Sequence, residues 1–238
     1  MIQEGYTVPT DITLPSNYPS RENVISRLEN LTTITTEDDL TIFTYSGHGD
    51  GTAGDLVFAT TKVNTGPYDT DTMDAETLLS LMAAIPGKKL IILDSCFSGM
   101  FVEDSSSSTN IILNNSIEKF FETYHSSDAY GKPDLFVFTA STNTLSYEKN
   151  FGTDDNTHFH GIFSYALLEA LGWKHTNVID PSQIAITYPP AATNGQITVD
   201  GLFAYIKKNQ AINSRYYGSE YQHPKTTGGP LDLVLFNL

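Results

Sequence analysis

Cysteine is almost absent from this chain, since Cys96 is the only one among 238 residues. A single cysteine excludes an internal disulfide and any metal site built from several cysteines. The sequence also lacks a long uninterrupted apolar run and a basic N-terminus followed by an apolar segment. We therefore expect neither a membrane-spanning helix nor a signal peptide. A reducing cytoplasm is the simplest expected location, and a mature secreted form is the alternative.

Basic residues are scarce, with 13 Lys and Arg against 28 Asp and Glu and a formal net charge of -15. Such a surface repels nucleic acid and anionic membranes at long range and attracts basic peptides. The expected partners are polypeptides with basic residues, without nucleic acid or membrane. The alternative is that the acidity only provides solubility. The charge does not indicate an oligomeric state.

Two short hydrophobic runs, Leu40 to Tyr45 and Leu90 to Leu93, each end abruptly in small and reactive residues. Continuous apolar runs of this length are typical of parallel strands covered by helices on both faces. Active groups gather where such strands end. We therefore expect His48, after the first run, and Cys96, after the second, to lie side by side at one edge of a sheet.

A thiol beside an imidazole is the combination needed for nucleophilic catalysis. Free cysteine has a pKa of about 8.5, so only a few per cent is thiolate at neutral pH unless a base assists. His48 would accept the proton of Cys96 and later protonate the leaving amine. Glycines on both sides of His48 allow a sharp turn and leave the Gly49 N–H free to point at the substrate.

The two strand ends, Ser46-Gly47-His48-Gly49 and Asp94-Ser95-Cys96-Phe97-Ser98-Gly99, resemble those of caspase-like (clan CD) cysteine peptidases. The likeness is greatest to the metacaspase branch, because true caspases carry Gln-Ala-Cys where this chain has Asp-Ser-Cys. The segments at 161–171 (GIFSYALLEAL) and 221–224 (YQHP) resemble segments further along the sequences of the same family. The resemblance implies a three-layer α/β/α sandwich with a mostly parallel central sheet. The chain begins without the segment that normally supplies the first strand, so we expect that strand to be missing.

The resemblance also implies roles for individual residues. The N–H groups of Gly49 and Cys96 would form the oxyanion hole, and Asp94 would bind an Arg or Lys at P1, the substrate residue before the cleaved bond. Ser46 matches a second residue of that pocket, and Ser141 is a further substrate-binding candidate. Asp94 leaves two alternatives open, because legumain-like enzymes with an acid at this position prefer Asn, and an aspartate can also cap a helix.

We expect one domain over residues 1–238, with a dyad-bearing part at about 1–103, a linker at about 104–133 and a specificity-loop part at about 134–238. The predicted function is an endopeptidase that cleaves after Arg or Lys through a His-Cys dyad and a thioester acyl-enzyme. The alternatives are a catalytically silent caspase-like interaction module and a legumain-like, Asn-directed peptidase. No cofactor or metal site is predicted as required. Calcium is a candidate, because several metacaspases need it and oxygen ligands suit it; the acids near the motifs are Asp50, Asp55, Asp69, Asp71, Asp74, Glu103 and Asp104.

Overall fold

The structure is a computed structural model that describes residues 19–49, 55–59, 70–95, 134–141, 146–151, 159–174, 185–214, 222, 224–228 and 232–238. Its centre is a four-stranded sheet in the order β1-β4-β5-β11. The first three strands are parallel, and β11 is antiparallel to β5. Their bounds are β1 Leu40–Gly47, β4 Lys88–Ser95, β5 Leu135–Thr139 and β11 Lys225–Gly228.

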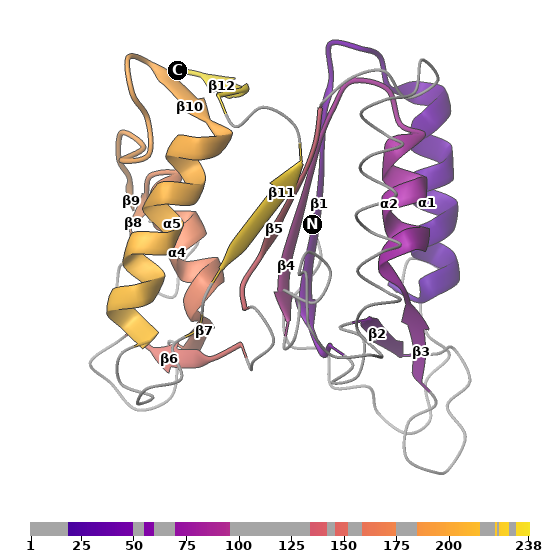
Figure 1. Ribbon diagram of the computed structural model, residues 1–238, viewed down its shortest axis with the longest axis horizontal. Coiled ribbons are helices and arrows are strands. Elements are labelled where there is room, and N and C mark those ends of the chain that lie inside the picture. The colour runs from indigo at the N-terminus through magenta and orange to yellow at the C-terminus, as the bar shows by residue number, and fades with distance from the viewer. Residues whose placement is uncertain are drawn as a thin grey trace.

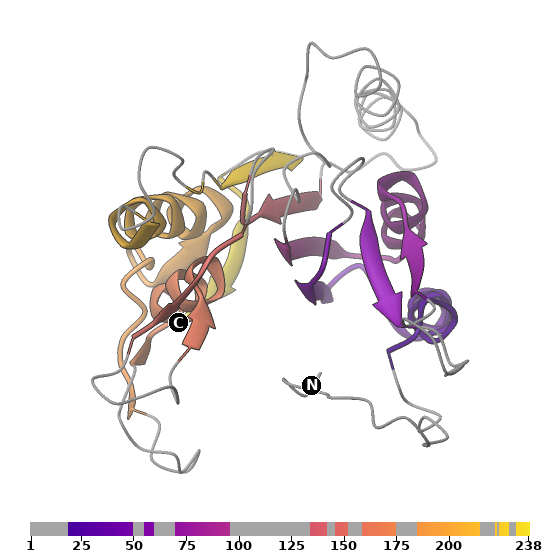
Figure 2. The same ribbon diagram turned by 90° about the horizontal axis from the view of Figure 1, so that it is seen from below.

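Helices cover both faces of this sheet, as Figures 1 and 2 show. On one face lie α1 (Arg21–Ile34) and α2 (Ala75–Ala83), and on the other lie α4 (Ile162–Ala170) and α5 (Val199–Ser214). Alternate residues of β4 enter two separate cores: Ile91 and Leu93 pack toward α1 and α2, whereas Leu90 and Ile92 pack toward α4 and α5. The predicted three-layer α/β/α arrangement is confirmed. No helix in the described segments is long and apolar enough to cross a bilayer.

Small two-stranded sheets surround the centre. The hairpin of β2 (Leu56–Ala59) and β3 (Thr70–Met73) and that of β6 (Glu148–Asn150) and β7 (Phe159–Gly161) lie at the end of the sheet where β1 and β4 terminate (Figure 1). The others pair β8 with β9 and β10 with β12. Their bounds are β8 Trp173–Lys174, β9 Ala185–Ile186, β10 Gln196–Thr198 and β12 Val234–Asn237.

The first strand differs from its prediction. Residues 89–95 of β4 are buried on both faces, as expected, but β1 lies at the edge of the described sheet. Ile42 on β1 is 44% exposed, and Thr44 and Ser46 are also exposed. Alternate residues of a strand point to opposite faces, so it is the α4 and α5 side of β1 that these helices do not cover. The segment that precedes the first helix falls outside the described residues.

Several element boundaries also differ. The apolar spacing of Leu78, Leu79 and Met82 predicts a helix over 73–84, but α2 begins at Ala75 with Asp74 as its cap, because Met73 belongs to β3. The polar segments at 60–72 and 144–160 predict loops, but the first includes most of β3 and the second includes β6 and most of β7. The last apolar segment forms β12, which pairs with β10, and the fourth strand of the central sheet is the polar segment β11. The predicted linker at 104–133 lies outside the described residues.

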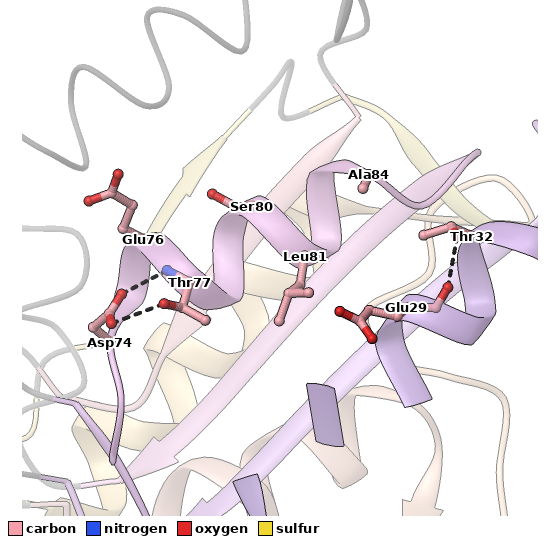
Figure 3. A pocket seen from close by; sticks show the side chains of 8 residues that line it. All are labelled: Glu29, Thr32, Asp74, Glu76, Thr77, Ser80, Leu81 and Ala84. Atoms are coloured by element: carbon pink, nitrogen blue, oxygen red, sulfur yellow. Dashed lines mark hydrogen bonds between the residues drawn. The ribbon is translucent and has the colours of Figure 1, made fainter. Parts of the chain in front are cut away.

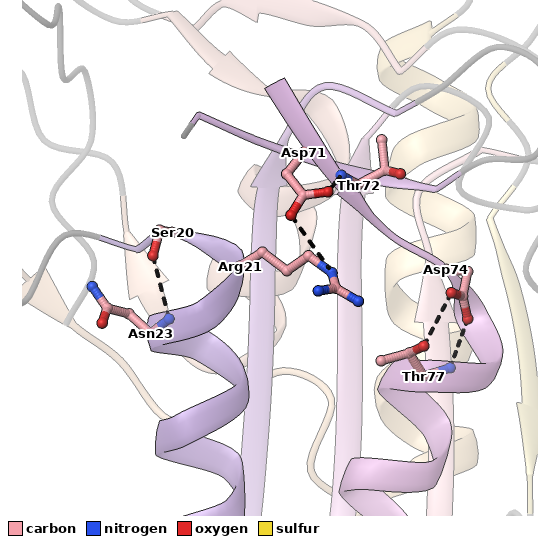
Figure 4. A network of polar contacts seen from close by, with 7 residues as sticks. All are labelled: Ser20, Arg21, Asn23, Asp71, Thr72, Asp74 and Thr77. Carbon is pink, nitrogen blue, oxygen red and sulfur yellow. Dashed lines mark hydrogen bonds and ion pairs between the residues drawn. The ribbon is translucent and has the colours of Figure 1, made fainter. Parts of the chain in front are cut away.

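A polar network joins α1 to the β3–α2 segment near the end of the sheet where β1 and β4 terminate (Figure 4). The Ser20 hydroxyl caps α1 by accepting the Asn23 N–H. Arg21 approaches Asp71 at 4.0 Å. Asp74 caps α2 by accepting from both the backbone and the hydroxyl of Thr77, at 2.7 and 3.0 Å. Caps of this kind each stabilise a helix by about 1 kcal/mol.

Candidate active site

The register of the two central parallel strands aligns the two predicted catalytic motifs. Ser46 pairs with Asp94 and Gly47 pairs with Ser95. The residue after β1 is His48, whose side chain is exposed, and the residue after β4 is Cys96. Cys96 itself lies outside the described residues, so its distance from His48 is not described. The two strands nevertheless end at the same level, as the sequence predicted.

The backbone at His48 is held by a tyrosine that the sequence analysis did not single out. The Tyr45 hydroxyl lies 2.8 Å from the His48 carbonyl oxygen and 2.7 Å from the Val57 carbonyl oxygen. The Val57 N–H also donates to the His48 carbonyl, at 3.1 Å. Tyr45 packs edge-on against Phe58. Burial raises the pKa of Tyr45 to about 12, against an opposing hydrogen bond to Val57, so the hydroxyl keeps its proton at neutral pH.

Gly49, which is predicted to supply one N–H of the oxyanion hole, directly follows His48. Gly49 forms an isolated antiparallel bridge with Leu56 of β2. The bond described at this bridge runs from the Val57 N–H to the His48 carbonyl, and it does not use the Gly49 N–H. The hairpin therefore supports the turn through the His48 carbonyl. Tyr45 and β2 thus both hold the His48 carbonyl, directly before the Gly49 amide.

Asp94 is buried, with 7% of its surface exposed, and it points toward the start of α4. Its Oδ1 accepts a hydrogen bond from the Ser146 hydroxyl at 2.6 Å. Its Oδ2 accepts two, from the Ser164 hydroxyl at 2.5 Å and from the Ser164 backbone N–H at 3.2 Å. The carboxylate thus caps α4, which has no side-chain cap of its own at Gly161. The predicted capping role is realised on a helix 70 residues away in sequence.

Two further residues shape the environment of Asp94. Gln222, which is fully buried, donates from Nε2 to the Ser146 hydroxyl at 3.2 Å and accepts the Tyr147 N–H at 2.9 Å. At Gly161 a Cβ atom would collide with Asp94 Oδ2, so only glycine permits this close approach. The sequence analysis noted both segments as motifs but assigned no role to Gln222 or Gly161. A single sequence carries no signal for these contacts.

The other two predicted binding residues differ in exposure. Ser46 is exposed, and because register partners on adjacent strands point to the same face, it shares the α4 side of the sheet with Asp94. Ser141 is fully buried at the end of β5, and its hydroxyl donates to the Ser95 carbonyl at 3.3 Å. Its role in substrate binding stays a prediction. The contact that the structure shows is with the residue before Cys96.

An aromatic cluster lies beside the Asp94 environment, next to Gly161. Phe151 and Tyr165 stack at 3.6 Å, and His160 lies 6.1 Å from Tyr165 and 5.9 Å from Trp173 between ring centres. Burial, reinforced by the nearby Glu169 carboxylate, raises the pKa of Tyr165 to about 12. The cluster fastens the β6–β7 hairpin to α4, and so it positions Gly161 and Ser164.

The described residues contain no group of three or more side chains suited to bind a metal. Of the acids named as calcium candidates, Asp71 accepts the Thr72 N–H and contacts Arg21, and Asp74 caps α2. The Thr72 contact is 2.8 Å long. Asp50, Asp69, Glu103 and Asp104 lie outside the described residues. Dependence on calcium therefore stays a prediction.

A hollow of about 600 Å³ lies between α1 and α2, on the far side of the sheet from the Asp94 carboxylate. Figure 3 shows Glu29 and Thr32 of α1 across from residues at the start and along the outer face of α2. Its remaining lining residues are Asp74, Glu76, Thr77, Ser80, Leu81 and Ala84. The hollow contains neither of the two strand ends, so it is not part of the candidate active site.

Comparison with known proteins identifies the family. The chain matches the caspase domain family (peptidase C14) over residues 2–185, and it therefore belongs to that family. Members are generally cysteine peptidases, whose substrates are polypeptides. The predicted recognition as a caspase-like protein is confirmed, whereas assignment to the metacaspase branch stays a prediction.

No curated protein matches the chain significantly. Among solved structures, the chain is similar to the crystal structure of protein GSU0716 from Geobacter sulfurreducens, with 16% sequence identity. The match covers 92% of this chain and 79% of that chain with a TM-score of 0.46. A likeness this distant carries no argument about activity.

Proposed function

We propose that this chain is a cysteine endopeptidase that cleaves peptide bonds after Arg or Lys, with His48 and Cys96 as its catalytic dyad. The observation that carries the proposal is the register of β1 and β4, in which Ser46 and Gly47 stand opposite Asp94 and Ser95. The residues that follow these pairs are the imidazole and the thiol. Family membership supports the same chemistry.

In the proposed mechanism, His48 accepts the proton from the Cys96 Sγ as the sulfur attacks the carbonyl carbon of the scissile bond. The N–H groups of Gly49 and Cys96 bind the developing oxyanion, which is worth about 3 kcal/mol per donor. The amine leaves with the proton held by His48, and a thioester remains. Water, activated by His48, then hydrolyses the thioester and restores the thiol.

The proposed preference for a basic P1 residue rests on Asp94, which stands two residues before the nucleophile and is buried on the α4 side of the sheet. A carboxylate and a cationic P1 side chain at 4 Å attract by about 4 kcal/mol at an effective dielectric near 20. The same carboxylate would repel a P1 aspartate. Exposed Ser46, its register partner, is proposed to line the pocket beside it.

Matched fluorogenic peptides that differ only in P1 (Arg, Lys, Asn and Asp) test this proposal. The expected result is turnover of the Arg and Lys peptides by the wild type and none by Cys96→Ala or His48→Ala. Repeating the assay with excess chelator measures any dependence on calcium. The proposal fails if the folded wild type cleaves none of the peptides, an outcome that instead favours a silent interaction module.

A second candidate is a legumain-like peptidase that cleaves after Asn. It is favoured by the three hydrogen bonds that already reach the Asp94 carboxylate, two of which cap α4. An aspartate with a purely structural role would leave a neutral P1 preference. Cleavage of the Asn peptide at least about tenfold faster than the Arg peptide would select this candidate.

A further inference from the structure

The hydrogen bonds around Asp94 determine how a cationic side chain can approach it. An ionised carboxylate offers about four lone-pair positions, two on each oxygen. In this chain the Ser164 hydroxyl and backbone N–H occupy both positions of Oδ2, and the Ser146 hydroxyl occupies one position of Oδ1. Within the described part of the chain, a single position remains, and it belongs to Oδ1.

The groups that donate hydrogen bonds to Asp94 are themselves held in place. Ser164 is fixed because it belongs to the first turn of α4, whose backbone supplies one of the two bonds. Ser146 is oriented by Gln222 Nε2, which fills one acceptor position of the hydroxyl and thereby favours donation to Asp94. Gln222 is itself buried and anchored by the Tyr147 N–H. The carboxylate is therefore preorganised rather than free to rotate.

The consequence concerns the choice between the two basic residues. A guanidinium gains its advantage over an ammonium from a bidentate fork, in which two parallel N–H groups reach both carboxylate oxygens. With Oδ2 saturated, that fork cannot form, and Arg and Lys are each limited to one charge-assisted hydrogen bond at Oδ1. We propose that Ser164 sets the P1 specificity of this peptidase by leaving Asp94 a single hydrogen-bond position, on Oδ1, for the P1 side chain. Lys and Arg are then accepted about equally.

This inference rests on the proposed function, and it makes opposite predictions for two neighbouring serines. Ser164→Ala removes a donor from Oδ2 and opens the fork, so the ratio of kcat/KM for Arg over Lys peptides should rise about tenfold, as one added charge-assisted hydrogen bond allows. Ser146→Ala frees a position only on Oδ1, so this ratio should stay within about twofold of the wild type. Ser164→Thr keeps the hydroxyl and should behave as the wild type.

The experiment measures kcat and KM for matched Arg and Lys peptides in the wild type, these three variants and Ser80→Ala. Ser80 is an exposed serine on α2 and serves as the matched control. Thermal unfolding of each variant shows whether α4 remains folded. A purely structural role for Ser164 would lower the melting temperature without changing the Arg to Lys ratio, and that result overturns the inference while the proposed function stands.

A second measurement uses only the wild type and is independent of how Ser164→Ala folds. A peptide with Nω-methylarginine at P1 keeps single N–H donors but weakens the fork. If Asp94 offers only one hydrogen-bond position, kcat/KM for the methylarginine peptide should lie within about threefold of the value for the arginine peptide. A loss greater than about tenfold indicates a bidentate contact in the wild type and overturns the inference. Absence of turnover for every basic peptide overturns the inference together with the proposed function.

Discussion

Tyr45→Phe tests how the backbone of His48 is held in position, because it leaves the imidazole itself unchanged. Tyr45 lies on β1 and reaches the His48 and Val57 carbonyl oxygens, at 2.8 and 2.7 Å, with its single hydroxyl proton. Phenylalanine keeps the ring and its edge-on contact with Phe58. The variant therefore removes the hydroxyl alone.

The size of the effect follows from counting partners. The His48 carbonyl keeps the Val57 N–H as a donor at 3.1 Å, so the loss amounts to about one hydrogen bond. One such bond contributes about 1 kcal/mol. For a chain of this size that corresponds to a melting temperature lower by about 2–4 °C. We also expect kcat/KM to fall about tenfold, because displacement of a catalytic group by a fraction of an ångström is costly in catalysis.

The same variant has a signature in the dependence of stability on pH. Burial raises the pKa of Tyr45 to about 12 in the folded state, above the value of 10.0 for an unperturbed tyrosine. The hydroxyl therefore adds its full stabilisation below pH 10, and this is lost as pH rises toward 12, where the unfolded chain releases the proton first. The free energy of unfolding of the wild type should fall more steeply over that interval than that of Tyr45→Phe, by up to about 1.4 kcal/mol per pH unit.

Urea unfolding at pH 7, 10 and 11, with peptide hydrolysis at pH 7, measures both effects. Tyr188→Phe is the matched control, because Tyr188 is 63% exposed. We expect the control to match the wild type in stability and in kcat/KM. An unchanged kcat/KM in Tyr45→Phe would show that the tyrosine does not position His48, and an equal alkaline slope would refute its burial as the origin of the raised pKa.

Three further substitutions test other parts of the structure. Gly161→Ala places a methyl group against Asp94 Oδ2, so kcat/KM for basic peptides should fall more than about tenfold, and an undiminished rate would contradict the geometry. Asp94→Asn keeps the shape but removes the charge, and should lower kcat/KM for Arg and Lys peptides about 100-fold while sparing an Asn peptide. Lys89→Met breaks a buried 2.8 Å ion pair with Asp134 and should destabilise the fold by about 3 kcal/mol in urea, most of which the double variant with Asp134→Leu should restore.

The strand ends could be predicted from sequence because their signal is local. The apolar run of β4 marks a buried strand, and the small residues after it mark its end. The small residues around His48 mark the end of β1 in the same way. The start of α1 has an equally local signal, since the Ser20 cap acts within three residues. The predicted burial of β1 was wrong because coverage by helices depends on which strands neighbour it, which an apolar run does not encode.

The residues around Asp94 could not be predicted, because their signal is not local in sequence. Ser146, Ser164 and Gln222 come from positions 52 to 128 residues beyond Asp94, on a loop, a helix and a terminal segment. Short polar side chains have no periodicity, and their convergence depends on how β5, α4 and the C-terminal segment pack. The segment Lys225–Gly228 was missed as a central strand because Thr and Gly give no apolar pattern.

The position of Asp94 links the stability of this domain to its proposed specificity. The carboxylate stabilises the N-terminus of α4 because it interacts with the helix dipole and accepts the Ser164 N–H. Helix capping of this kind needs a fixed anion. Recognition of a cationic P1 side chain needs the same anion to keep an accessible lone pair. The saturation of Oδ2 and the partial occupancy of Oδ1 meet both requirements at once, because each oxygen is given chiefly to one task. A substitution that frees a position on Oδ2, such as Ser164→Ala, is therefore expected to improve recognition of Arg while it weakens the cap of α4.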